Sequence, residues 1–187
     1  MAGNPTAYQT MSQKYDGKIQ WPRQSDYVLR VIDEEFTQSK STGNPMIHLT
    51  VEVDRPEEVE IAGEVYMIAG QKCELYYVTK TLEGPDAEDK SVNNAKRVKD
   101  LYDLFELPSD NINLENPELG FKGKLVFAMM DSETKERRGS PTKEQLAKGM
   151  KQGDILKNPI TGKPLIYYVP KVVEIFGLAT ADVGKPF

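Results

Sequence analysis

Two runs of alternating apolar residues, 27–31 and 47–53, constrain the fold of this 187-residue chain more than any other feature. In each run every odd-numbered residue is apolar, so these side chains share one face of a β-strand. The segment between them, 37–45, is rich in Ser, Thr, Gly, Asn and Pro, which favour turns. The pattern predicts a long β-hairpin with a hydroxyl-rich tip that carries Lys40.

Similar patterns predict the other strands. Residues 72–80 alternate again and indicate a third strand. Residues 119–129 and 165–176 indicate two more, the last of them interrupted by Pro170. Between 59 and 68 the apolar residues are less regular, which leaves a short hairpin and an irregular strand as alternatives.

One amphipathic helix is predicted between the third and fourth of these major strands. Apolar residues recur at spacings of three and four from Val92 to Phe105. Ser91 is suited to cap the start of this helix, and Pro108 to stop it.

The resulting order predicts a mainly β fold. It fits a five-stranded Greek-key barrel of the OB type, with one α-helix between the third and fourth strands and a long insert before the last strand. Periodicity alone also leaves other small barrels and α+β sandwiches open. We expect one domain over residues 26–177, because the chain is long enough for one sizeable core but short for two. An irregular N-terminal arm (1–25) and a C-terminal tail (178–187) would flank it.

Opposite charges are separated along the chain. The formal net charge is -5, which disfavours a nucleic-acid partner. Residues 1–80 and 81–120 have net charges of -4 and -6, whereas residues 121–171 hold 11 Lys+Arg and 5 Asp+Glu, a net of +6. This segregation predicts a basic face or arm, centred on a basic insert at 131–165 in which 142–150 is compatible with a short helix. An insert that is only a solvated loop is the alternative.

Composition excludes several kinds of site. The single cysteine, Cys73, rules out an internal disulfide, and with His48 as the single histidine the chain has too few soft ligands for a structural zinc site. His48 lies on the polar side of its predicted strand, so we expect it at the surface.

No apolar run approaches the roughly 20 residues that cross a bilayer, and the first residues lack a basic flank and an apolar segment. We expect a soluble, unsecreted, cytoplasmic protein that does not associate with membranes.

Enzymatic motifs are incomplete. Residues 40–42 resemble the end of a phosphate-binding loop, yet Ser39 stands where glycine is required. No nucleophile elbow accompanies His48. The carboxylates that would meet across adjacent strands to bind magnesium for a nuclease are Glu52, Asp54 and Glu74. Alternating carboxylates are more typical of a solvated face, so we expect a non-enzyme with neither cofactor nor metal.

The hairpin tip also supports a family resemblance. Residues 39–46 read Ser-Lys-Ser-Thr-Gly-Asn-Pro-Met and lead into the apolar run 47–53. This segment resembles that of bacteriophage single-stranded DNA-binding proteins, whose second strand is entered through a similar Ser-Lys-x-x-Gly-Asn-x-Met segment. The helix before Leu107-Pro108, the stretch 119–124 and the closing 167–173 also lie where such proteins have them, so the resemblance covers about residues 26–177.

The resemblance implies sequence-independent binding and protection of single-stranded DNA during phage DNA replication or recombination, in the cytoplasm of an infected bacterium. Single-stranded DNA would be the partner, with phage replication or recombination proteins as further candidates. One feature departs from the related bacterial proteins, which end in an acidic tail with an apolar tip. Here Pro186-Phe187 follows Lys185, and Asp182 is the one acidic residue nearby.

Binding of this kind combines stacking of bases on aromatic rings with basic contacts to phosphates. Tyr76 is the leading stacking candidate, because Cys73 and Tyr77 lie on the opposite side of the same strand, which we expect to be buried. For Tyr77, Phe127 and Tyr102 we expect core positions. The candidate stacking residues are Trp21, Tyr76, Tyr167 and Tyr168. The candidate phosphate contacts are Arg30, Lys40, Lys72, Lys122, Lys124, Arg137 and Arg138, the last two in an insert that we expect to close over DNA.

A protein of a different class is the alternative. The same barrel would also suit a non-catalytic structural or assembly module, for example a virion-associated one. The net charge of -5 favours this hypothesis.

Overall fold

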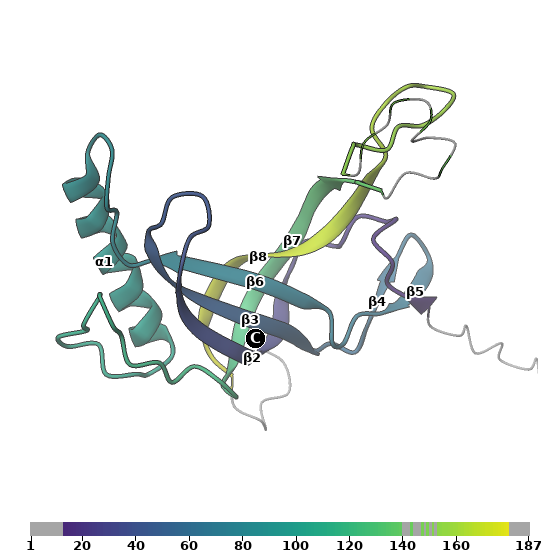
Figure 1. Cartoon of the computed structure of the whole chain (residues 1–187). Helices are drawn as coiled ribbons and strands as arrows, with labels where there is room; N and C mark the ends of the chain where they lie inside the picture. The colour runs from purple at the N-terminus through teal and green to yellow at the C-terminus, as the bar shows by residue number, and fades with distance from the viewer. Residues whose placement is uncertain are drawn as a thin grey trace, which may run out of the picture.

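The computed structural model describes residues 13–139 and 153–179, together with residues 143, 147, 149 and 151. In this part of the chain the fold is mainly β, as predicted, with two sheets and one long helix (Figure 1). The elements are β1 (Gln13–Lys14), β2 (Gln24–Gln38), β3 (Pro45–Arg55), β4 (Glu58–Ile61), β5 (Glu64–Met67), β6 (Lys72–Val78), α1 (Ala87–Leu104), β7 (Leu125–Glu136) and β8 (Ile166–Leu178).

The larger sheet has five strands in the order β6-β3-β2-β7-β8, and each neighbouring pair is antiparallel. The predicted hairpin is its centre, because β2 pairs with β3 on one side and with β7 on the other. The third strand and the two late strands are confirmed. The structure therefore reproduces the predicted order of strands and helix.

The prediction of a closed barrel is not met, because β6 and β8 are not hydrogen-bonded neighbours. Two features of β8 explain the opening. Tyr168 donates its backbone N–H to the carbonyl of Gly17, at 2.7 Å, rather than to β6. Two residues further on, Pro170 has no N–H to donate. The sheet thus stays open between its first and last strands.

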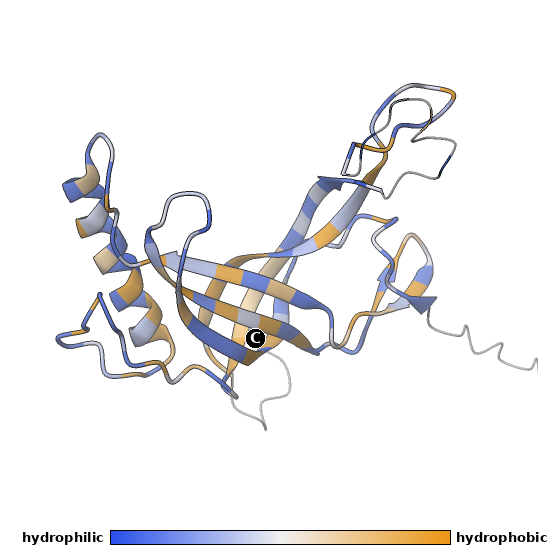
Figure 2. Ribbon diagram, viewed as in Figure 1, coloured by the Kyte–Doolittle hydropathy of each residue, from blue (hydrophilic) through white to orange (hydrophobic). Residues whose placement is uncertain are grey.

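The core lies on the inner face of this sheet. The odd-numbered side chains of β3 from Ile47 to Val53 are buried, as are Leu29 and Val31 on β2. Figure 2 shows the matching alternation of apolar and polar residues along the strands. The even-numbered side chains of β3 are left on the outer face, as the period of two requires.

The helix α1 covers one end of the sheet (Figure 1) and begins earlier than predicted. Its first residue is Ala87, after Asp86 in a left-handed conformation. Ser91 is therefore inside the helix, where its hydroxyl bonds the carbonyls of Ala87 and Thr81, at 2.8 and 3.2 Å, and ties the helix to the segment after β6. The helix ends at Leu104, before Pro108 as expected. The aromatic rings that pack this end edge to face are Tyr102, Phe105 and Phe121.

The smaller sheet lies at the other end of the molecule and has the order β1-β5-β4 (Figure 1). It resolves the alternatives for residues 59–68 in favour of a short hairpin, β4–β5. The strand β1 comes from the predicted irregular arm and pairs in parallel with β5. Residues 15–21 of that arm also join the core: Trp21 is 1% exposed, and its ring meets that of Tyr15 edge to face at 4.9 Å.

The insert is in part a continuation of the sheet. The strand β7 was predicted to end near Met129 but runs to Glu136, which pairs with Ile166 of β8. Isolated bridges extend the hairpin further, joining Arg138 to Ile155 and Lys157 to Pro164. We call residues 131–139 and 153–170 the β7–β8 arm; in Figure 1 it projects beyond the sheet at the end away from α1. Most of the short helix predicted at 142–150, and the tail beyond residue 179, lie outside the described residues.

Gly17 provides a test of how the N-terminal segment covers β8. Its φ is +77°, and an added Cβ would lie 2.7 Å from the carbonyl oxygen of Tyr168. We expect Gly17→Ala to lower the free energy of unfolding by about 3 kcal/mol, of which about 1–2 kcal/mol is backbone strain and the rest is the collision. Chemical denaturation monitored by circular dichroism measures this loss.

Gly63 in the β4–β5 turn is the matched control. Its φ is +84° and nothing lies within 4 Å of a Cβ there, so Gly63→Ala should show only the backbone strain. Equal losses for the two variants would mean that the close approach to Tyr168 is not a tight constraint.

Candidate functional site

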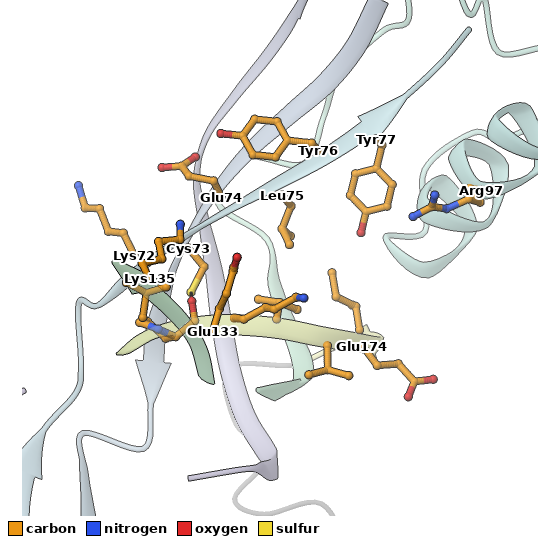
Figure 3. A pocket seen from close by; sticks show the side chains of 16 residues that line it. Lys72, Cys73, Glu74, Leu75, Tyr76, Tyr77, Arg97, Glu133, Lys135 and Glu174 are labelled. Carbon is orange, nitrogen blue, oxygen red and sulfur yellow. Dashed lines mark hydrogen bonds between the residues drawn. The ribbon is translucent and has the colours of Figure 1, made fainter. Parts of the chain in front are cut away.

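The open seam between β6 and β8 forms a cleft of about 600 Å³ (Figure 3). We call it the β6–β8 cleft. It is lined by residues 72–77 of β6 and 169–175 of β8, with Glu133 and Lys135 from β7 and Arg97 from α1. Because three separate parts of the sheet and the helix contribute, the cleft exists only in the folded chain.

The floor of the β6–β8 cleft is mostly apolar. Figure 3 shows Cys73, Leu75 and Tyr77 on the side of β6 that faces the cleft, with Tyr77 directed toward Arg97. Burial raises the pKa of Tyr77, and the nearby charge of Arg97 opposes part of this rise. At the narrow part of the cleft the Sγ of Cys73 lies 3.4 Å from the carbonyl oxygen of Pro170 and donates to it.

Tyr76 lies on the opposite, outer side of β6, as the parity predicted (Figure 3). Its side chain is among the large apolar groups left exposed, at 54%. One face of its ring stacks on the ring of His48, which is its direct cross-strand partner on β3, with centroids 4.7 Å apart and planes 10° apart. An exposed aromatic ring held flat by a neighbour is a surface on which another planar group can stack.

Lysines and glutamates both line the cleft: Lys72, Lys135 and Lys171 with Glu74, Glu133 and Glu174. Within the described part of the chain, Lys72, Lys135 and Lys171 make neither a side-chain hydrogen bond nor an ion pair. Asp131 lies opposite Lys171 in the β7–β8 pairing but is 3.7 Å from Arg23 instead. Among the described residues, no ion pair therefore ties these three lysines to a carboxylate, although three glutamates line the same cleft.

Three of the predicted residues meet on the β7–β8 arm. Arg137, Arg138 and Tyr167 line a shallow hollow of about 360 Å³ together with Glu136. Tyr167 also lies directly opposite Lys135 in the strand pairing, so the two side chains share one face. Since Lys135 belongs to the cleft as well, the hollow and the β6–β8 cleft are neighbours along the arm.

The other predicted phosphate contacts are less favourably placed. Two nitrogens of Arg30 donate to the same carboxylate oxygen of Asp54, and Lys122 lies 3.3 Å from Asp33, so a carboxylate offsets each charge. Lys40 is exposed in the turn between β2 and β3, and Lys124 is half-buried at the start of β7. Neither lines the cleft.

Trp21 is a correction. Sequence reasoning made it a stacking candidate, but the indole is buried against Tyr15 and Tyr27 in the core, where no base can reach it. Tyr168 is half-buried, and its backbone is bound by the N-terminal segment through Gly17. Tyr102 is in the core as expected, and Tyr77 packs against the core.

Sequence reasoning did not single out Lys135, Lys171, Arg97 or His48 as site residues. Lys135 was counted only as one basic residue of the insert. Lys171 follows Pro170, and a proline in a strand marks an edge, which was the available signal for a residue beside an opening. Arg97 lies on a helix distant in sequence from the strands that it joins, and no local pattern indicates that.

The outer face of β2 and β3 is acidic. According to the strand pairing, this side, which also has His48 and Thr50, holds Asp33, Glu35 and Glu52.

The three carboxylates of the nuclease hypothesis do not converge: Asp54 contacts Arg30, while Glu74 accepts hydrogen bonds from Thr50 and His48. Among the described residues no three His, Cys, Asp or Glu side chains are grouped to hold a metal ion.

Comparisons with known proteins add no identification. No family model, curated protein or solved structure matches this chain. In the described part of the chain, no helix combines the length and the apolar character needed to cross a bilayer.

Cys73 reports on whether the narrow part of the cleft stays closed. Burial, with a smaller contribution from the charge of Glu74, raises the pKa of its thiol to about 12. At pH 8 only about one thiol in ten thousand is then the reactive thiolate. We expect the native protein to react with a thiol reagent at least about 100-fold more slowly than the protein unfolded in denaturant; equally fast reaction would show that β6 and β8 separate at this point.

Proposed function

We propose that this protein is a non-catalytic, sequence-tolerant single-stranded DNA-binding protein. The observation that supports the proposal is the exposed ring of Tyr76 on the outer side of β6, a strand whose Lys72, like Lys135 and Lys171 of the same cleft, makes no ion pair in the described part of the chain. Every base has a π-face, so stacking on an aromatic ring does not read sequence, while basic side chains follow the phosphates.

The charges define a path for the strand. Asp33, Glu35 and Glu52 on the outer side of β2 and β3 repel a phosphate backbone toward the β6 edge of the same side, where Tyr76 lies. From Tyr76 the backbone would pass Glu74 to reach Lys72, two outward positions further along β6, then cross the rim to Lys135 and continue to Arg137 and Tyr167 on the arm. The path thus has an aromatic ring at each end and basic groups between them, the combination that sequence-tolerant binding uses.

We further propose that the sheet is an OB-type arrangement with one open seam. Its order, β6-β3-β2-β7-β8, corresponds to OB strands three, two, one, four and five, and α1 stands between the third and fourth. In OB folds the ligand lies on strands two and three, bordered by the hairpin of strands four and five. These positions are taken here by β3, β6 and the β7–β8 arm, which supports the same path. A role in phage DNA replication or recombination is the cellular context that the sequence resemblance implies.

The acidic face of β2 and β3 supports a second candidate, an assembly module that binds protein and not nucleic acid. Fluorescence anisotropy with labelled oligo-dT at low salt separates the two. The first proposal requires binding that weakens as salt rises, whereas absence of binding at low salt leaves the assembly module as the better proposal.

Tyr76 provides the sharpest test of the stacking surface. We expect Tyr76→Ala to weaken oligo-dT affinity by about 5- to 150-fold, because one aromatic platform contributes about 1–3 kcal/mol per stacked base. Tyr76→Phe should retain most of the affinity. Phe176→Ala is the control, since this ring is also exposed, at 47%, but lies outside the proposed path. Unchanged affinity in a folded Tyr76→Ala protein contradicts the assignment.

Salt dependence tests the basic rim. The logarithm of affinity falls with the logarithm of salt concentration by about 0.7 per neutralised phosphate of a single strand. We expect the double variant Lys135→Ala/Arg137→Ala to reduce this slope by about 1.4, because both side chains are exposed on the arm.

A matched double variant removes the same charge elsewhere. Lys14→Ala/Lys96→Ala changes exposed residues on β1 and α1, away from the path, and should leave the slope unchanged. If both double variants shift the slope equally, the attraction comes from net charge and not from the arm.

A further inference from the structure

We infer that His48 is a positioning residue for Tyr76: fixed by Glu74, it holds one face of the tyrosine ring and leaves the opposite face for a nucleobase. The inference rests on the proposed single-strand binding and adds a residue to it. The three side chains come from two adjacent strands, β3 and β6.

The strand pairing brings the group together. His48 of β3 is directly opposite Tyr76 of β6, and Thr50 is opposite Glu74 two residues further along β3 on the same side of the sheet. Side chains of such neighbouring pairs are close enough to interact along one face of a sheet. The arrangement follows from register and needs no loop to maintain it.

Hydrogen bonds fix the imidazole ring. The Nε2 of His48 lies 2.5 Å from the Oε2 of Glu74, and this same oxygen accepts from the hydroxyl of Thr50 at 2.9 Å. The carboxylate is thus held from two sides, and it sets the plane in which the imidazole lies. Tyr76 stacks on that plane at 10°, so its ring orientation is set in turn by His48.

The stack prepares Tyr76 for a ligand. An exposed tyrosine on a strand exchanges between rotamers, and a ligand that stacks on it has to immobilise the ring. Here His48 occupies one face before any ligand arrives, and the opposite face remains exposed. A base on that face would complete a stack of three rings.

Three side chains face His48. Glu35 from β2 lies 3.9 Å from Nδ1, and Glu74 and Tyr76 come from β6. Two carboxylates and the tyrosine ring therefore surround the imidazole, which limits the orientations that it can take.

The experiment is a double-mutant cycle in oligo-dT affinity at constant ionic strength. We expect His48→Ala to weaken binding about three- to tenfold in a folded protein. In a Tyr76→Ala background the same change should have almost no effect, because a positioning residue acts through the ring that it orients. Full additivity of the two losses would overturn the inference.

Rescue by a conservative variant is the second readout. His48→Gln keeps a planar group whose N–H can donate to Glu74, so it should recover most of the affinity that His48→Ala loses. Wild-type binding with an unchanged His48→Ala affinity refutes the inference and leaves the proposed function standing. Absence of wild-type binding refutes the proposed function itself, so the two failures are distinguishable.

Discussion

Burial of the odd-numbered side chains of β3 decides which side of the sheet meets solvent, and the proposed binding path depends on it. Ile47, Leu49 and Val51 are fully buried, so the even-numbered residues of β3 point outward. Because Tyr76 of β6 pairs directly with His48 of β3, its side chain also points outward. A shift of one residue in the pairing register would bury Tyr76 and expose the core side chains to water, which would remove the burial free energy of several large apolar residues at once. The stacking surface is therefore as secure as the core beneath it.

The distribution of ion pairs reconciles an acidic chain with the proposed polyanionic ligand. Carboxylates on β2 and β3 offset nearby basic groups, as Asp54 does for Arg30, whereas the rim lysines have no such partner among the described residues. Net charge describes the field at long range, while affinity at contact depends on the few charges that remain uncompensated. Position along the fold thus matters more than the sum of charges.

The elements with a strong period could be predicted from sequence, and the contacts between distant segments could not. Alternation identified the β2–β3 hairpin and β6, because one face of each strand is apolar. The predicted start of α1 at Ser91 was wrong, because the helix begins at Ala87. The hydroxyl of Ser91 does not cap the helix but bonds the carbonyls of Ala87 and of Thr81, a contact outside the helix that the sequence does not reveal. Trp21 gave no sign that Tyr15 and Tyr27 would enclose it. At the site, parity indicated Tyr76 correctly as outward, but the β6–β8 cleft depends on a pairing that does not form, which no local pattern encodes.

The same missing pairing leaves two strand edges without a partner strand, and such edges are where separate chains join and aggregate. The residues along these edges oppose that outcome. Lys72 and Glu74 stand along β6, while Pro170 and Lys171 stand along β8. A proline removes a donor that a foreign strand would need, and a charged side chain has to lose water when another strand covers it. The seam can therefore stay open to solvent at the high protein concentrations that the proposed coating of a nucleic acid would demand, without recruiting a second chain into the sheet.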